Sequence, residues 1–400
     1  MMSEFRNLME AGHGGGAAPT VDLETAIGVI SGTSMDGIDV ALIRSDGADR
    51  VEAGPAATFP YPGPLARTLR AVVAEPAEAE KPQAALEQAV TDAHVAAVEA
   101  FIGRFDVAPA SVALIGMHGQ TILHRPRARL TRQLCDGARA AAALGIDVVC
   151  DFRSADVVAG GEGAPLAPIY HAAIAARLER PLMVLNWGGV GNVTYLGPGR
   201  EIVAFDTGPA NALIDDFLLA RRGVAFDENG GLAAQGRVDR GLVQEMMRDP
   251  YFLRPAPKSL DRNHFAAAAA LVEKLVDADG AATLSAFTVE ATAAALDRIP
   301  EAPRRWLVGG GGRRNPLLMR RLGERLGVSV EPVEAIGFDG DAIEAQCFAY
   351  LGLRSLKGAP LSFPTTTGAP EPMTGGRFWP APQNERAPHS RGPLRSVGSI

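Results

Sequence analysis

The sequence places one carboxylate, Asp206, where it could act as a general base. It follows the apolar residues 202–205 and precedes Thr207-Gly208-Pro209, so we expect it at the end of a strand beside a turn. A carboxylate at such a position can face a cleft and accept a proton there. Position alone also allows an ordinary turn residue or a helix N-cap.

A second candidate is a loop of small residues near the N-terminus. Residues 27–43 comprise two apolar, strand-like runs joined by a loop that contains Gly32, Thr33 and Ser34. Small residues let a ligand approach the backbone, whose N–H groups, together with the hydroxyls, can donate hydrogen bonds to a phosphate. Asp36 and Asp39 add carboxylates that can position a magnesium ion. The alternative is an ordinary hairpin with a polar turn.

Two further glycine loops follow strand-like segments. Residues 182–186 lead into a glycine-containing loop at 187–192, and a strand pattern follows at 193–196. Residues 306–312 end in four glycines before a helical pattern at 316–322. Glycines allow a flat ligand to lie on the backbone, and the helix N-terminus adds the positive end of its dipole.

Helix and strand patterns alternate between these loops. Apolar residues recur at helical spacing in residues 82–105, and we expect a short buried strand at 112–117. Such alternation predicts helices packed on a largely parallel sheet. The first strand leads into neither a G-x-G-x-x-G turn nor a P-loop, which argues against a Rossmann dehydrogenase and a P-loop nucleotidase.

Composition limits the partners and the compartment. The chain has 400 residues, of which 47% are hydrophobic and 21% charged, and this predicts a soluble globular protein of two domains. The formal net charge of −7 argues against nucleic acid or an anionic membrane as a partner. Scattered cysteines, together with the lack of a long apolar stretch or a signal-peptide pattern, predict a cytoplasmic protein. Residues 1–21 and 380–400 are expected to be disordered ends.

The three glycine loops, in this order, resemble the phosphate-1, phosphate-2 and adenosine motifs of the sugar kinase, Hsp70 and actin superfamily. The resemblance implies an α/β fold of two ribonuclease-H-like lobes with ATP in the cleft between them. Lobe I would comprise residues 22–178 and 344–379, and lobe II residues 179–343. The resemblance assigns ATP contacts to Gly32, Thr33, Ser34, Met35, Asp36, Gly37, Ile38, Asp39, Gly188, Gly189, Asn192, Gly309, Gly310, Gly311 and Asn315.

More specific motifs narrow the resemblance to one family. The segments S-G-T-S-M-D-G at 31–37, H-G-Q-T-I at 118–122, D-F-R at 151–153, G-A-P-L at 163–166 and F-D-T-G-P at 205–209 are similar to those of the anhydro-N-acetylmuramic acid kinase family. Members convert 1,6-anhydro-N-acetylmuramic acid, ATP and water into N-acetylmuramic acid 6-phosphate and ADP during cell-wall recycling. The similarity implies ATP and Mg²⁺ as cofactors, a homodimer, and Asp206 as the catalytic base.

The chemistry of this substrate allows a single base to promote both the attack of water on C1 and the transfer of the phosphoryl group to O6. A 1,6-anhydro sugar has no free 6-hydroxyl, so phosphorylation at O6 requires the C1–O6 bond to break while water attacks C1. A carboxylate that takes the proton from this water makes the nucleophile, and O6 leaves C1 as it attacks the γ-phosphorus. We expect Asp206 to be that carboxylate.

The resemblance also assigns residues to the sugar. Arg153 could pair with the lactyl carboxylate, because its planar guanidinium suits bidentate recognition. Glu344, on a helix predicted at 341–350, has a family counterpart that faces the sugar, although a solvated helix carboxylate is the alternative. Thr121 is expected to line the substrate cleft, and His124 to have a structural role.

Three departures from the family pattern leave the preferred sugar open. Ser154 and Ala155 stand where two arginines are usual, and Glu162 stands where glutamine is usual. Leu260-Asp261 replaces a threonine-glycine pair. Two other functions also stay open: a non-catalytic member that senses a nucleotide or cell-wall sugar, and a sugar kinase that acts on an ordinary hydroxyl without opening a ring.

Overall fold

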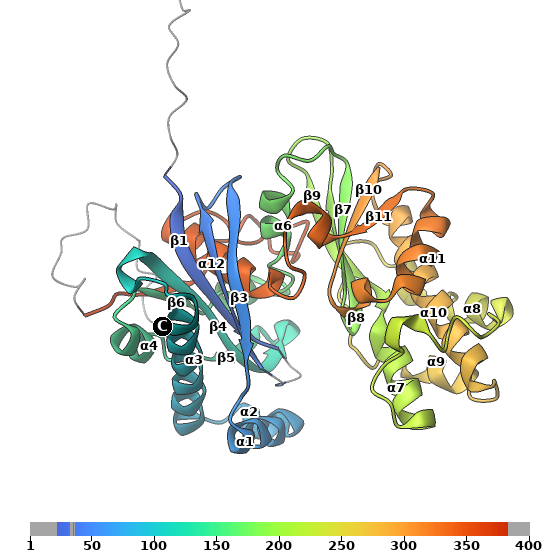
Figure 1. Ribbon diagram of the computed structural model, residues 1–400, viewed down its shortest axis with the longest axis horizontal. Helices are drawn as coiled ribbons and strands as arrows, with labels where there is room; N and C mark the ends of the chain where they lie inside the picture. Colours follow the sequence, from blue (N-terminus) through green and yellow to red (C-terminus); the bar gives the residue numbers. More distant parts are fainter. Residues whose placement is uncertain (1–21, 33–34, 36, 383–400) are drawn as a thin grey trace, which may run out of the picture.

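The computed structural model describes residues 22–32, 35 and 37–382, arranged around two β-sheets (Figure 1). The predicted leader, most of the predicted tail, and Thr33, Ser34 and Asp36 lie outside the described residues. The first sheet has the order β12-β6-β4-β1-β2-β3, with β5 beside β4, and the second has the order β11-β10-β7-β8-β9. The strands are β1 (Glu24–Ser31), β2 (Ile38–Ser45), β3 (Val51–Phe59), β4 (Val112–Arg125), β5 (Leu130–Leu134), β6 (Val148–Cys150), β7 (Leu182–Trp187), β8 (Val190–Leu196), β9 (Ile202–Pro209), β10 (Arg305–Gly309), β11 (Ser329–Pro332) and β12 (Arg377–Trp379).

The two sheets share one topology. Each begins with three antiparallel strands in a meander, β1-β2-β3 or β7-β8-β9, and the first of these pairs in parallel with a later strand, β4 or β10. The repetition confirms the expected pair of ribonuclease-H-like lobes. The prediction of a largely parallel sheet was wrong, because short connections between successive strands produce antiparallel neighbours and only the crossovers give parallel pairs.

The first sheet is buried on both faces. Its helices are α1 (Gly63–Ala74), α2 (Pro76–Ala79), α3 (Ala84–Phe105), α4 (Gly137–Leu144), α5 (Ser154–Ala159) and α12 (Ile343–Leu356). One face packs on α3, as the apolar spacing in residues 82–105 predicted, and the other packs on α12. Burial on both sides accounts for the nearly continuous apolar sequence of β1.

The helix α12 lies so close to the first sheet that two strand positions must be glycine. A Cβ atom on Gly28 would lie 1.8 Å from the carbonyl oxygen of Ala345, and one on Gly116 would lie 1.9 Å from that of Phe348. Any side chain at either position would push the helix away from β1 and β4. Although α12 follows the second sheet along the chain, it therefore belongs to the first.

The second sheet is covered by helices from its own half of the chain. These are α7 (Asn211–Arg222), α8 (Arg240–Met246), α9 (Ala266–Leu271), α10 (Asp277–Ala293) and α11 (Pro316–Leu326). The opposite face meets α6 (Pro168–Ile174) in a core that also contains α12, so one cluster of buried apolar side chains joins the two lobes. Among the described residues, no helix is both long and apolar enough to span a membrane.

Candidate active site

A row of residues crosses the second sheet at one level. Gly309 of β10 pairs with Asn186 of β7, Asn186 pairs with Asn192 of β8, and Asn192 pairs with Asp206 of β9. Side chains of directly paired residues point to the same face of a sheet, so the two asparagines and the aspartate face one side together. Asn186 was not among the residues predicted from the sequence. Its signal was a polar residue at the end of an apolar strand, just before a glycine loop.

A cavity of about 200 Å³ lies against this row. Its walls include Asn186, Asn192 and Gly310 from the second sheet and its loops, and Asp39 and Glu344 from the first lobe. Residues from all three predicted ATP motifs therefore meet at one cavity, together with one predicted sugar residue. Asp206 does not line this cavity, although Asn192 is its neighbour across the strand pair.

Among the described residues of the first glycine loop, Asp39 lines this cavity. Met35 and Ile38 are buried in the core of the first lobe, so their side chains cannot reach a nucleotide. The carbonyl of Gly32 accepts from the backbone N–H of Met35 at 3.2 Å, which closes a tight turn. A carboxylate oxygen of Asp39 accepts a 2.6 Å hydrogen bond from the Thr58 hydroxyl.

The second loop is fixed by the start of α7. The carbonyls of Gly188 and Gly189 accept from the backbone N–H groups of Asn211 and Ala210, each at 3.0 Å. The Asn211 side chain donates to the carbonyls of Trp187 and Gly188 at 2.9 and 3.0 Å. A Cβ atom would find no atom closer than 3.7 Å at Gly188 or 3.5 Å at Gly189. The fold itself therefore leaves room at these glycines, as a bound phosphate would require.

The third loop contains one glycine that the backbone itself demands. Gly310 has φ +69°, and a Cβ atom there would lie 2.3 Å from Oδ1 of Asn186. At Gly311 the nearest atom would be 3.8 Å away, so that position is open. The Asn315 side chain accepts from the N–H groups of Leu317 and Leu318 and caps α11. Its predicted contact with ATP stays a prediction.

Asp206 lies inside strand β9 and not at its end, and three hydrogen bonds hold it. Its N–H donates to the carbonyl of Lys258 at 2.9 Å, and its own carbonyl accepts from the Tyr251 hydroxyl at 2.6 Å. Its carboxylate Oδ2 accepts from the N–H of Leu260 at 2.7 Å. Burial raises the pKa of the carboxyl to about 6, against the opposing effects of the Leu260 N–H and the Lys258 charge. Such a carboxylate is ionised at neutral pH yet basic enough to take a proton.

The predicted sugar residues lie on the first lobe. Arg153 donates from Nε to Nε2 of His118 at 3.0 Å and from Nη1 to the carbonyl of Gly163 at 2.8 Å. Glu344 is accessible from the cavity, yet the surrounding protein raises its pKa, with a further rise from Asp39 and an opposing effect from Arg153. Thr121 on β4 accepts from the amide of Gln133 at 3.3 Å. The pKa of Glu344 is therefore affected both by Asp39, a predicted nucleotide residue, and by Arg153, a predicted sugar residue.

A second cavity, of about 570 Å³, adjoins the loop that holds Asp206. Leu260 is in its wall, together with Arg127 and Glu162 from the first lobe and Arg254 and His264 from the second. The unusual Glu162 thus shares its surroundings with cationic side chains. A second carboxylate, Asp261, lines the same cavity.

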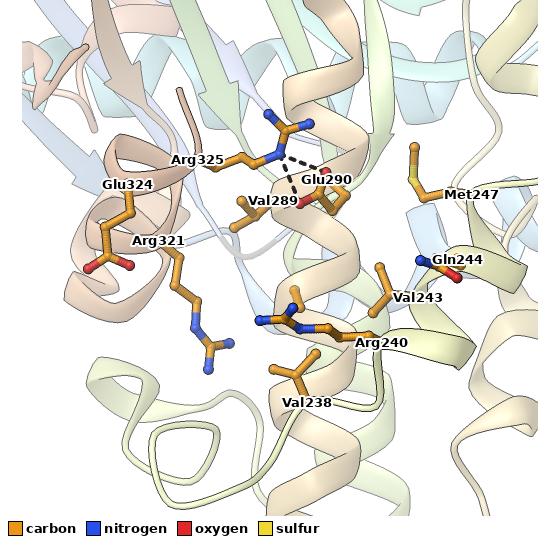
Figure 2. A pocket seen from close by; sticks show the side chains of 11 residues that line it. Val238, Arg240, Val243, Gln244, Met247, Val289, Glu290, Arg321, Glu324 and Arg325 are labelled. Atoms are coloured by element: carbon orange, nitrogen blue, oxygen red, sulfur yellow. Dashed lines mark hydrogen bonds and ion pairs between the residues drawn. The ribbon is translucent and has the colours of Figure 1, made fainter. Parts of the chain in front are cut away.

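A third cavity lies away from all these residues. It measures about 810 Å³ and is formed by α8, α10 and α11, with Arg325 of α11 paired to Glu290 of α10 across one side (Figure 2). None of the predicted site residues lines it. Its volume exceeds that of the two cavities described above, so size alone does not identify the predicted site.

The described part of the chain holds no cluster of three or more His, Cys, Asp or Glu side chains able to bind a metal ion. Of the described residues predicted to bind ATP, Asp39 is the one carboxylate in the wall of the smaller cavity, which Asp341 and Glu344 also line. This fits Mg²⁺, which is usually held by one or two carboxylates together with the phosphates of the substrate. The assignment of Asp36 lies outside the described residues.

Comparisons with known proteins cover nearly the whole described chain. The family model described as anhydro-N-acetylmuramic acid kinase matches residues 24–381. An anhydro-N-acetylmuramic acid kinase of Rhodospirillum rubrum is 53% identical over 358 residues, which cover 89% of this chain and 94% of that protein. One from Acidiphilium cryptum is 51% identical over 357 residues, with coverage of 88% and 97%.

Solved structures also align over most of the chain. Component A of (R)-2-hydroxyglutaryl-CoA dehydratase from Acidaminococcus fermentans has a TM-score of 0.45 at 11% identity, and the match covers 82% of this chain and 99% of that one. A ROK family glucokinase from Streptomyces griseus, in complex with glucose and AMPPNP, has a TM-score of 0.37 at 14% identity, with the same coverage of 82% and 99%.

Proposed function

The chain belongs to the anhydro-N-acetylmuramic acid kinase family, and we propose that it opens 1,6-anhydro-N-acetylmuramic acid with water and phosphorylates O6 from ATP. The products would be N-acetylmuramic acid 6-phosphate and ADP, in peptidoglycan recycling. The observation that carries this proposal is the row from Gly309 to Asp206, because it joins the nucleotide loops to a carboxylate with a raised pKa.

Asp206 is the proposed base. Its carboxylate takes a proton from a water molecule as that water's oxygen bonds to C1, and the C1–O6 bond breaks. The electron pair released to O6 attacks the γ-phosphorus, the bond to the β,γ-bridging oxygen breaks, and ADP leaves. The N–H of Leu260 holds one carboxylate oxygen of Asp206 throughout, which fixes the orientation of the other. Bound Mg²⁺ would neutralise phosphate charge beside Asp39.

Arg153, Glu344 and Thr121 are proposed to bind the sugar. Because Nε and Nη1 of Arg153 already donate to His118 and Gly163, the Nη2 group remains for the lactyl carboxylate. This arrangement supports a charge-assisted hydrogen bond from one edge of the guanidinium.

The same hypothesis includes several broader features of the protein. These are the lobe boundaries at residues 22–178 plus 344–379 and 179–343, a homodimer, a cytoplasmic location, and closure of the lobes around the substrates. Closure would limit the site to the one water that reacts, because ATP hydrolysis is the competing loss.

One labelling experiment tests the reaction. The protein is incubated with ATP, Mg²⁺ and the anhydro sugar in ¹⁸O-water, and the products are analysed by mass before anomeric exchange. We expect a phosphorylated sugar with one label, at C1. Label in free phosphate would show an ATPase, binding without turnover would show a sensor, and turnover only of sugars with a free hydroxyl would show an ordinary sugar kinase.

A further inference from the structure

Asp206 is held by one short segment of the second lobe. Residues 251–260 supply all three of its hydrogen bonds beyond the strand ladder: the Lys258 carbonyl, the Leu260 N–H and the Tyr251 hydroxyl. The Leu260 contact uses the backbone, so it does not depend on the side chain. This explains how the segment can hold Asp206 although leucine replaces the usual threonine there.

The buried Lys258 side chain binds back to Tyr251, at the other end of this segment. It is 7% exposed, and its Nζ donates to the carbonyl of Tyr251 at 3.1 Å. The same Nζ lies 4.2 Å from the centre of the Tyr251 ring and 5.9 Å from that of Phe205, the residue before Asp206. Aromatic faces attract a cation but replace only part of its hydration. A buried ammonium with this environment is costly to keep for packing alone.

We propose that Lys258 and Tyr251 are positioning residues for the base. Lys258 locks Tyr251 against β9 and places a positive charge behind the Asp206 carboxylate, while Tyr251 holds the Asp206 carbonyl. We call Lys258, Tyr251 and the backbone of residues 258–260 the clamp. Among the described residues no hydrogen bond reaches Oδ1 of Asp206, so the clamp leaves that oxygen for water. The inference rests on the proposed role of Asp206.

The charged groups around the clamp set the pH range in which both Asp206 and Lys258 are ionised. Lys258 lowers the pKa of Asp206, in opposition to burial. Burial, followed by Arg298 and Arg254, lowers the pKa of Lys258 to about 8, and Asp206 opposes this. Between about pH 6 and about pH 8 both groups are therefore ionised. Below this window Asp206 takes up a proton and the base is lost.

The test uses pH profiles of the full-length protein. Lys258→Met keeps the length of the side chain without its charge, Lys258→Arg restores the charge, and Lys274→Met removes an exposed lysine of the same lobe as a control. We expect the acid limb of kcat/KM in Lys258→Met to move upward by about one pH unit, as loss of a nearby opposite charge requires. The arginine variant and the control should keep the wild-type limb.

The Tyr251→Phe variant tests the clamp without a change of charge. It keeps the ring but loses the hydroxyl that binds the Asp206 carbonyl, so we expect kcat to fall several-fold with the KM for ATP and the acid limb unchanged. This variant also tests the proposal if Lys258→Met does not fold. A wild-type kcat in Tyr251→Phe, or an unmoved acid limb in folded Lys258→Met, overturns the inference. Appreciable activity in Asp206→Asn instead overturns the proposed base itself.

Discussion

Replacing Asp206 by asparagine should abolish activity and, at the same time, stabilise the folded protein. Asparagine keeps the size of the side chain and an oxygen that can accept from the Leu260 N–H, but it cannot take a proton from water. Loss of a positioned base typically lowers the rate by about 10² to 10⁴. Binding of ATP and sugar should be nearly unchanged, since the change affects the transition state.

The gain in stability follows from the raised pKa. Burial raises the pKa of Asp206 from 3.8 to about 6, so the folded state binds this proton more tightly than the unfolded state does. The ionised carboxylate therefore costs the folded protein as much as about 3 kcal/mol above pH 6, at about 1.4 kcal/mol per pKa unit. As pH falls from about 6 to about 4 this cost disappears. The asparagine variant never carries it.

Thermal unfolding at several pH values measures this effect. The Tm of Asp206→Asn should exceed that of the wild type by several degrees at pH 8, and the difference should fade by about pH 4. Asp215 on α7 offers a matched control, because burial also raises its pKa to about 6. Asp215→Asn should show the same pH-dependent stabilisation and keep its activity. A Tm difference for Asp206→Asn that does not change with pH would refute the electrostatic reasoning.

Three further outcomes follow from the site. Gly311→Leu should raise the KM for ATP by about tenfold or more, equivalent to about 1.4 kcal/mol, because the open space there would receive the nucleoside. Gly103→Leu, at another open glycine on α3, should leave the KM for ATP unchanged. An effect of Gly311→Leu mainly on the sugar KM would mean that the motif is misassigned. Arg153→Met should raise the sugar KM by the loss of a charged hydrogen bond, about 1.5–3 kcal/mol, without changing the KM for ATP; equal effects on both would point to a folding defect. In the wild type, kcat/KM should fall as pH drops through about 6, where Asp206 gains its proton; a profile flat to pH 5 would contradict that assignment.

Local patterns in the sequence predicted the elements well where they were strongly periodic or bounded by glycine. The helix predicted at 82–105 is α3 (Ala84–Phe105), and the opening hairpin is β1 and β2. The strand predicted at 112–117 continues to Arg125 as β4, because pairing with β5 stabilises its polar second half. Strand direction was not predictable from alternation alone, since it depends on how each connection crosses the sheet.

Some residues of the predicted site could be identified from the local sequence, and others only from the tertiary structure. Glycine loops and Asp206 stand out in the sequence because their residue types and neighbours are unusual. The contributions of Asn186, Lys258 and Tyr251 depend on pairing across strands or on a segment about 50 residues away, which only the fold brings together. A buried lysine also resembles any surface lysine until its environment is known.

The glycines that contact α12 connect the fold to the mechanism. Because Gly28 and Gly116 bring this helix into backbone contact with β1 and β4, Glu344 at its first turn must move with the first sheet. Arg153 is tied to the same sheet through His118 on β4. Asn192 and Asp206 belong to the second sheet. The proposed closure of the lobes would therefore change the separation between the proposed sugar residues and the proposed base, while each group keeps its internal geometry.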